Sequence, residues 1–144
     1  MAIWFNIETK NFDLKNKRKL KSWVNTIISD YKFTTGSINY IFVERDSILE
    51  INKKYLQHSY FTDIITFDFT EQNYLISADI YVCPEVVLEN SKKYGTRFNE
   101  ELKRVIIHGI LHLVGYKDHT QEEKALMRKL EDAAIKPVKD LLIV

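Results

Sequence analysis

The residues most able to do chemistry are three histidines in the segment HGILHLVGYKDH, which spans residues 108–119. On an α-helix, residues four apart differ by about 40° in azimuth and lie one turn apart, so His108 and His112 project side by side and can hold one ion. Gly115 lets the chain leave the helix and turn back, which brings His119 within reach as a third ligand. The spacing predicts a zinc site made by His108, His112 and His119.

Three imidazoles leave the fourth tetrahedral position to water, which is typical of a catalytic rather than a structural zinc site. The alternative is a packed histidine pair without metal, which is common at this spacing. The surrounding helix favours metal, because burying two histidines costs free energy unless each ring nitrogen has a partner. Its apolar residues are Leu102, Val105, Ile106, Ile107, Ile110, Leu111, Leu113 and Val114.

The histidine helix is expected from Asn99 to Val114, with a stop at Gly115. Thr120 and Glu123 have the spacing of a capping box, which predicts a final helix to about residue 134. The earlier helices are expected at 14–31 with Asp13 as its cap, from Asp46 or Ser47 onward, and from Pro84 to Gly95. The expected strands are 2–8, 37–44, 63–69 and 75–82, the last two forming a hairpin.

These elements predict one α+β domain with a four-stranded mixed sheet and about five helices over residues 1–144. The hydrophobic fraction of 45% is enough for a real core, and no apolar run approaches the length needed to cross a bilayer. The N-terminus lacks the pattern of a secretory signal. A single cysteine, Cys83, excludes an internal disulfide and fits a reducing compartment, so we expect a cytoplasmic protein.

A formal charge of +1 gives no overall attraction to nucleic acid, so RNA affinity requires a local basic surface. The run from Lys10 to Lys21 holds six cations and one acid, which fits either an RNA contact or a solvated helix face. The candidate RNA-binding residues are Lys15, Lys17, Arg18, Lys19, Lys53 and Lys54.

HGILHLVGYKDH closely resembles the zinc-helix signature H-G-x-L-H-L-x-G-Y-D-H of the YbeY endoribonucleases. Further blocks similar to that family are TDIITF (62–67), ADIYVCPEVV (78–87) and NEELKRVIIHG (99–109). The resemblance implies a zincin-like fold with one zinc ion per chain. It also implies a single-strand-specific endoribonuclease that acts in small-subunit rRNA 3′-end processing and ribosome quality control. The implied partners are rRNA, the small ribosomal subunit, and ribosomal proteins or an assembly GTPase, without a membrane or DNA.

Two positions depart from the family pattern. Lys117 is an extra residue, so His112 and His119 stand seven apart where the family's second and third histidines stand six apart. Leu56 follows Tyr55 where the family usually has an arginine, and Lys53, Lys54, His58 and Arg97 are the alternative sources of positive charge.

The candidates for a base, or for a partner of the histidine N–H groups, are Asp63, Asp79 and Asp118. The attacking group is either water or a ribose hydroxyl. A metallopeptidase is a rival hypothesis, but its H-E-x-x-H motif needs a glutamate where this chain has Gly109. The other rival is a non-catalytic ribosome-assembly factor with structural zinc.

Overall fold

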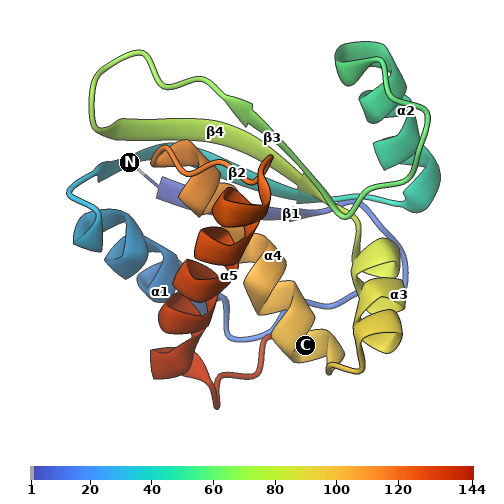
Figure 1. Ribbon diagram of the computed structural model, residues 1–144. Helices are drawn as coiled ribbons and strands as arrows, with labels where there is room; N and C mark the ends of the chain where they lie inside the picture. Colours follow the sequence, from blue (N-terminus) through green and yellow to red (C-terminus); the bar gives the residue numbers. More distant parts are fainter. Residues whose placement is uncertain (1) are drawn as a thin grey trace.

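The strands form one mixed sheet in the order β1-β2-β4-β3. A computed structural model describes residues 2–144 and places β1 at Ala2–Ile7, β2 at Thr34–Phe42, β3 at Ile64–Asp68 and β4 at Leu75–Val82. β1, β2 and β4 are parallel, and β3 runs antiparallel to β4. This arrangement confirms the predicted four-stranded mixed sheet and its hairpin, and it leaves β3 at an edge (Figure 1).

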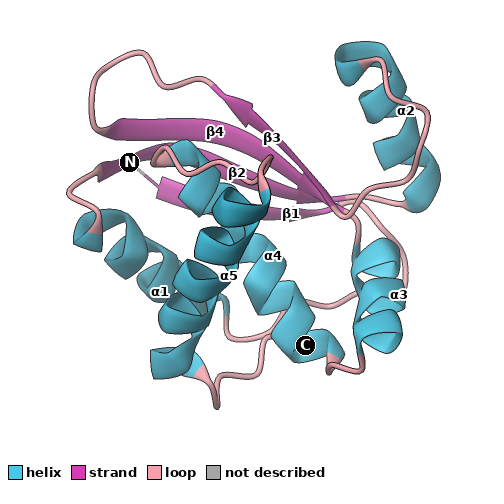
Figure 2. Ribbon diagram, in the orientation of Figure 1, coloured by secondary structure: helices cyan, strands magenta, loops and turns pink. Residues whose placement is uncertain are grey.

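The helices lie on both sides of this sheet (Figure 2). Figure 1 shows α1, α4 and α5 beneath one face, and α2 beyond the opposite face. The helix bounds are α1 Lys17–Asp30, α2 Arg45–Leu56, α3 Pro84–Tyr94, α4 Phe98–Leu113 and α5 Gln121–Ile135, followed by a short 3-10 helix, η1, at Lys136–Val138. Within residues 2–144, no helix combines the length and apolarity needed to cross a bilayer.

Alternation along the strands decides which side chains meet α4. Ile76, Ala78, Ile80 and Val82 of β4 point to the larger core, which includes Ile106 and Ile110 of α4. Their neighbours point to the opposite face, where a smaller cluster joins the sheet to α2 and α3 through Ile41, Val43, Ile48, Ile65, Cys83 and Val86. A polar residue of β3 or β4 can therefore reach the histidine helix only from alternate positions.

Most predicted helix ends are confirmed. Thr120 and Glu123 form the capping box of α5, and Gly95 ends α3 with a φ of 70°. The predicted cap of the first helix is wrong. α1 begins at Lys17 after Asn16, not after Asp13, because the Asn16 side chain donates a 2.6 Å hydrogen bond to the carbonyl of Leu142. A contact with the far end of the chain thus decides where α1 starts.

The C-terminal tail is tied to the first half of α4. The buried side chain of Asn99 donates to the carbonyl of Leu141 at 3.0 Å and accepts from the backbone N–H of Ile143 at 2.7 Å. The fully buried ammonium of Lys103 donates to the carbonyls of Val138 and Lys139 at 2.9 and 3.3 Å. These bonds satisfy backbone groups of a segment that lies outside the sheet.

We predict that Asn99→Ala lowers the free energy of unfolding by about 1–3 kcal/mol, because it leaves two tail backbone groups without their partners. Urea denaturation would measure the decrease. Asn90→Ala is the matched control, since Asn90 lies within α3 and makes none of these tail contacts. Equal stability of the two variants would contradict the role assigned to Asn99.

Candidate metal centre

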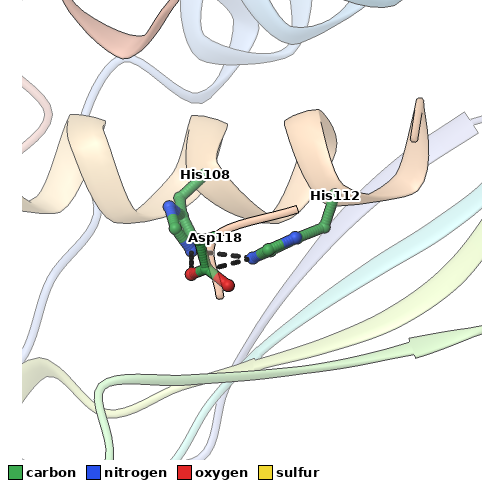
Figure 3. Close-up of side chains that lie close together, drawn as sticks. All are labelled: His108, His112 and Asp118. Carbon is green, nitrogen blue, oxygen red and sulfur yellow. Dashed lines mark hydrogen bonds and ion pairs between the residues drawn. The ribbon is translucent and has the colours of Figure 1, made fainter. Parts of the chain in front are cut away.

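Two histidines of α4 and one aspartate from the following loop converge on one point (Figure 3). His108 Nε2 and His112 Nε2 are 2.9 Å apart. Asp118 Oδ2 lies 3.2 Å from the first nitrogen and 3.4 Å from the second. A tetrahedral zinc ion with bonds of about 2.0–2.1 Å has ligand atoms about 3.3 Å apart, so the three atoms fit three corners of such a site.

The other ring nitrogens fix which atoms face this point. His112 Nδ1 lies 2.8 Å from the carbonyl of Tyr116, an acceptor only, so Nδ1 carries the proton and donates. His108 Nδ1 lies 2.6 Å from Glu131 Oε2 and donates to that carboxylate in the same way. In the neutral rings both Nε2 atoms then present lone pairs to each other. Their repulsion is relieved by a shared cation, which is what a metal site supplies.

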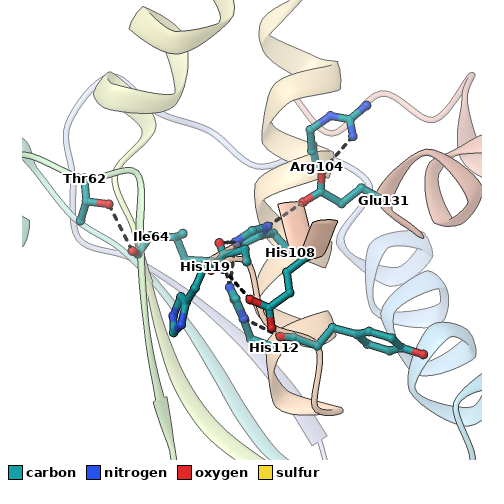
Figure 4. A network of polar contacts seen from close by, with 10 residues as sticks. Thr62, Ile64, Arg104, His108, His112, His119 and Glu131 are labelled. Carbon is teal, nitrogen blue, oxygen red and sulfur yellow. Dashed lines mark hydrogen bonds and ion pairs between the residues drawn. The ribbon is translucent and has the colours of Figure 1, made fainter. Parts of the chain in front are cut away.

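A buried ion-pair network stands behind His108 (Figure 4). Glu131 is only 5% exposed and accepts from Arg104 Nη1 at 2.9 Å, while Arg104 Nη2 donates to Asp132 at 2.6 Å. Burial by itself would lower the pKa of His108, but the hydrogen bond and charge of Glu131 and the carboxylates of Asp118 and Asp63 together raise it above its usual range. Without a metal, His108 therefore holds a proton more readily than an ordinary histidine.

The convergent atoms lie in a groove of about 530 Å³ between α4, β3 and the loop after α4. We call it the metal groove. Its walls include the acids Asp63, Asp68 and Asp118 and, among residues 2–144, no lysine or arginine. Burial raises the pKa of Asp63, against the lowering effect of His108. A phosphate would therefore meet only negative or neutral side chains unless a metal ion or a protonated histidine were present.

The loop residue that reaches the two helix histidines is Asp118. It stands six residues after His112, the spacing at which the YbeY signature has its third histidine, so Lys117 moves the histidine itself one place further on. His119 lines the same groove, but its ring points away from the other two (Figure 4), and its backbone N–H donates to Glu123. Its role as a ligand stays a prediction.

The structure separates the other candidates. Asp63 lies in the metal groove. Asp79 lies on the opposite face of the sheet, because its neighbours in β4, Ala78 and Ile80, point to the main core. Its register partners in the adjacent strands are Asn39 and Phe67. Leu56 also lines the metal groove, so the position of the family arginine is part of its wall.

The proposed substitutes for that arginine lie elsewhere. Lys53 and Lys54 are in the last turn of α2, where Lys54 covers the ring of Tyr55. His58 stacks on Tyr60. Arg97 pairs with Glu100 at the opposite end of α4 from the histidines. None of these four side chains lines the metal groove as described over residues 2–144.

Comparison with known proteins supports a family assignment. A family model described as Endoribonuclease YbeY matches residues 4–139. The chain belongs to the YbeY family. Relatives named Endoribonuclease YbeY include one from Parabacteroides distasonis, 42% identical over 94% of both chains, and one from Bacteroides fragilis, 44% identical over 94% of this chain and 96% of that one. The solution structure of TM1509 from Thermotoga maritima is similar, with a TM-score of 0.62, 27% identity, and coverage of 94% of this chain and 92% of that chain.

We predict that Glu131→Gln lowers the zinc affinity about 10- to 100-fold, because it removes the carboxylate that orients His108. Competition with a chromogenic chelator would measure the change. Asp132→Asn is the control, since Asp132 is exposed and touches Arg104 but neither histidine. Equal zinc affinities in the two variants would rule out this role for Glu131, and circular dichroism would verify that both are folded.

Proposed function

We propose that this protein is a zinc-dependent endoribonuclease. The observation that carries the proposal is the convergence of His108 Nε2, His112 Nε2 and Asp118 Oδ2, with both Nδ1 atoms already committed to acceptors. Two imidazoles and a carboxylate suit zinc, and His119 is a further candidate ligand in the same groove. Relatives that are 42% and 44% identical to this chain bear the name Endoribonuclease YbeY, which supports the proposed activity.

Zinc, when bound, would act as a Lewis acid, lowering the pKa of a coordinated water to about 7 and stabilising charge on a phosphoryl oxygen. The protein's own part is to hold the two imidazoles rigidly on α4 and to direct both Nε2 atoms at one point, where a bound metal would replace the proton that His108 otherwise takes up readily. Asp63 faces His108 across the metal groove and is the proposed proton acceptor for the attacking hydroxyl. The attacking group is water or a ribose hydroxyl.

The proposed substrate is single-stranded RNA, with maturation of the 3′ end of small-subunit rRNA and ribosome quality control as the setting. Small-subunit particles and their ribosomal proteins, or an assembly GTPase, are the corresponding partners. This part of the proposal rests on the resemblance of the four sequence blocks to the YbeY family and on the names of the relatives.

Gly109 argues against the metallopeptidase alternative. A Cβ at this position would lie 3.1 Å from Ile64 Cδ1 and 3.2 Å from Thr66 Oγ1, so α4 packs closely on β3 there. A metallopeptidase of the H-E-x-x-H type needs a glutamate at this place as its general base. The residue after the first histidine faces the sheet, and a carboxylate there would be buried against β3.

We predict that the purified protein cleaves a single-stranded rRNA fragment in the presence of zinc, and that His108→Ala abolishes the cleavage. Gel analysis with and without a chelator would measure it, and casein would serve as the control substrate. A 2′,3′-cyclic phosphate product would identify the ribose hydroxyl as the attacking group. Intact RNA with every metal tested, together with normal binding to small-subunit particles, would instead indicate an assembly factor with structural zinc.

We predict that Asp118→Ala lowers the zinc content of the purified protein more than His119→Ala does, because Asp118 already lies within 3.4 Å of both Nε2 atoms. Elemental analysis of freshly purified variants would measure the bound metal. Full zinc occupancy in Asp118→Ala, with reduced occupancy in His119→Ala, would assign the third ligand to His119. Lys117→Ala is the matched control in the same loop.

A further inference from the structure

The side chains of the metal groove do not account for binding of a polyanion such as RNA. Among residues 2–144 its walls contain no lysine or arginine, and three of its side chains are carboxylates. The formal charge of the whole chain is only +1, so the average field cannot supply the attraction. If RNA is the substrate, as proposed above, phosphate contacts must be made on another surface.

Such a surface lies between α1 and the segment that follows α5. A groove of about 720 Å³ is lined there by Lys19 of α1 and by Lys136 and Lys139 of the C-terminal segment. It adjoins a second depression along α1 that adds Arg18 and Lys21 and shares Ser22 and Thr26 with it. We call these two depressions together the α1–η1 groove.

The charge of the α1–η1 groove is not neutralised by neighbours. None of its five cations forms an ion pair with a carboxylate of residues 2–144, although Arg45, Arg97, Lys103 and Arg104 elsewhere all do. The acids on its walls are Asp30 and Asp140. The same walls carry the hydroxyl of Ser22 and the side-chain amide of Asn25, which can donate hydrogen bonds to phosphate or ribose, whereas the Thr26 hydroxyl already donates to the carbonyl of Ser22.

The groove is held in shape by hydrogen bonds between its two walls. Asn16 donates to the carbonyl of Leu142, and the indole N–H of Trp23 donates to the carbonyl of Ala134 at 2.9 Å. Buried Lys103 holds the carbonyls of Val138 and Lys139 from below. Because the backbone is fixed before a ligand arrives, the entropy cost of ordering it on binding is small.

The η1 side of the α1–η1 groove and the metal groove lie toward opposite ends of α4. Lys103, which anchors η1, precedes His112 by nine residues, a rise of about 14 Å along α4. α1 lines the α1–η1 groove from its first turn to Asp30, and Tyr31, just after α1, packs on Tyr116, in the loop after His112. Figure 1 shows α1 and α4 on the same face of the sheet.

We infer that the α1–η1 groove is an RNA-backbone exosite, which binds a part of the RNA other than the segment in the metal groove. Lys19, Lys136 and Lys139 contact phosphates, and Lys15, Lys17, Arg18 and Lys21 extend the basic surface along α1. The inference rests on the proposed function. It assigns Lys136 and Lys139, which lie far in sequence from the basic run, to the same surface as that run.

The test compares the salt dependence of RNA binding in two variants that remove equal charge. In Lys136→Ala/Lys139→Ala, the magnitude of the slope of log affinity against log salt for a long single-stranded rRNA fragment should fall by about 1.4, since each lysine–phosphate interaction with a single strand contributes about 0.7. Lys92→Ala/Lys93→Ala, on exposed positions of α3, should keep the slope of the unchanged protein. Binding is measured with a chelator present, so that no RNA is cleaved.

Equal slopes for the unchanged protein and both variants would overturn the exosite. The basic groove would then be a site for an acidic polypeptide instead of RNA. An oligonucleotide too short to leave the metal groove should already show the smaller slope with the unchanged protein. If the protein cleaves RNA but Lys136→Ala/Lys139→Ala has the same salt slope as the unchanged protein, the exosite is wrong and the nuclease function stands. If the slope falls in that variant but no metal supports cleavage, the RNA-binding surface is confirmed and the nuclease function is wrong.

Discussion

The site depends on the Nε2 atoms of two imidazoles held 2.9 Å apart on a rigid helix. Each ring is fixed from behind by an acceptor, the buried carboxylate of Glu131 for His108 and the carbonyl of Tyr116 for His112. Two nitrogens can be brought this close at low cost where a proton on one of them, or a metal ion bound by both, relieves the repulsion of their lone pairs. The packing of α4 on the sheet, the ion pair of Arg104 with Glu131 and the turn at Gly115 all serve to keep this geometry.

The two histidines proposed as ligands are not equivalent. His108 is backed by a buried carboxylate whose charge is balanced by Arg104, whereas His112 is backed by a neutral carbonyl. A carboxylate partner raises the basicity of the imidazole and strengthens its hold on a metal. In the proposed metal site, His108 is therefore the ligand whose basicity depends more on its surroundings, and its carboxylate partner Glu131 comes from α5, a helix that carries no proposed ligand itself.

Charge is divided between two surfaces of the molecule. The metal groove is lined by carboxylates and histidines, and the α1–η1 groove by lysines and an arginine that pair with no carboxylate of residues 2–144. Under the proposed function, a bound metal is the main positive charge near the scissile phosphate, and the proposed exosite holds the RNA backbone elsewhere. It also agrees with Leu56, which occupies the groove wall where the family usually has an arginine.

The sequence alone determined the elements and the two helix histidines, because both depend on local rules. A periodicity of 3.6, a capping box at Thr120 and Glu123, and a four-residue spacing between histidines act within one or two turns of chain. Asp118 is a candidate base or histidine partner from the sequence alone. Its six-residue spacing from His112, which matches the family's third histidine, also indicates a position within reach of the two helix histidines. Glu131 was not singled out, because its partner His108 lies 23 residues away.

Only the tertiary structure decided the rest, since each remaining feature joins distant segments. The pleat of β4 sends Asp79 to the face opposite the metal groove, although its neighbours reach the main core. A hydrogen bond between Asn16 and Leu142, 126 residues apart, sets the start of α1 in place of Asp13. The same meeting of the chain's two ends brings Lys136 and Lys139 beside Lys19, and no local pattern encodes that contact.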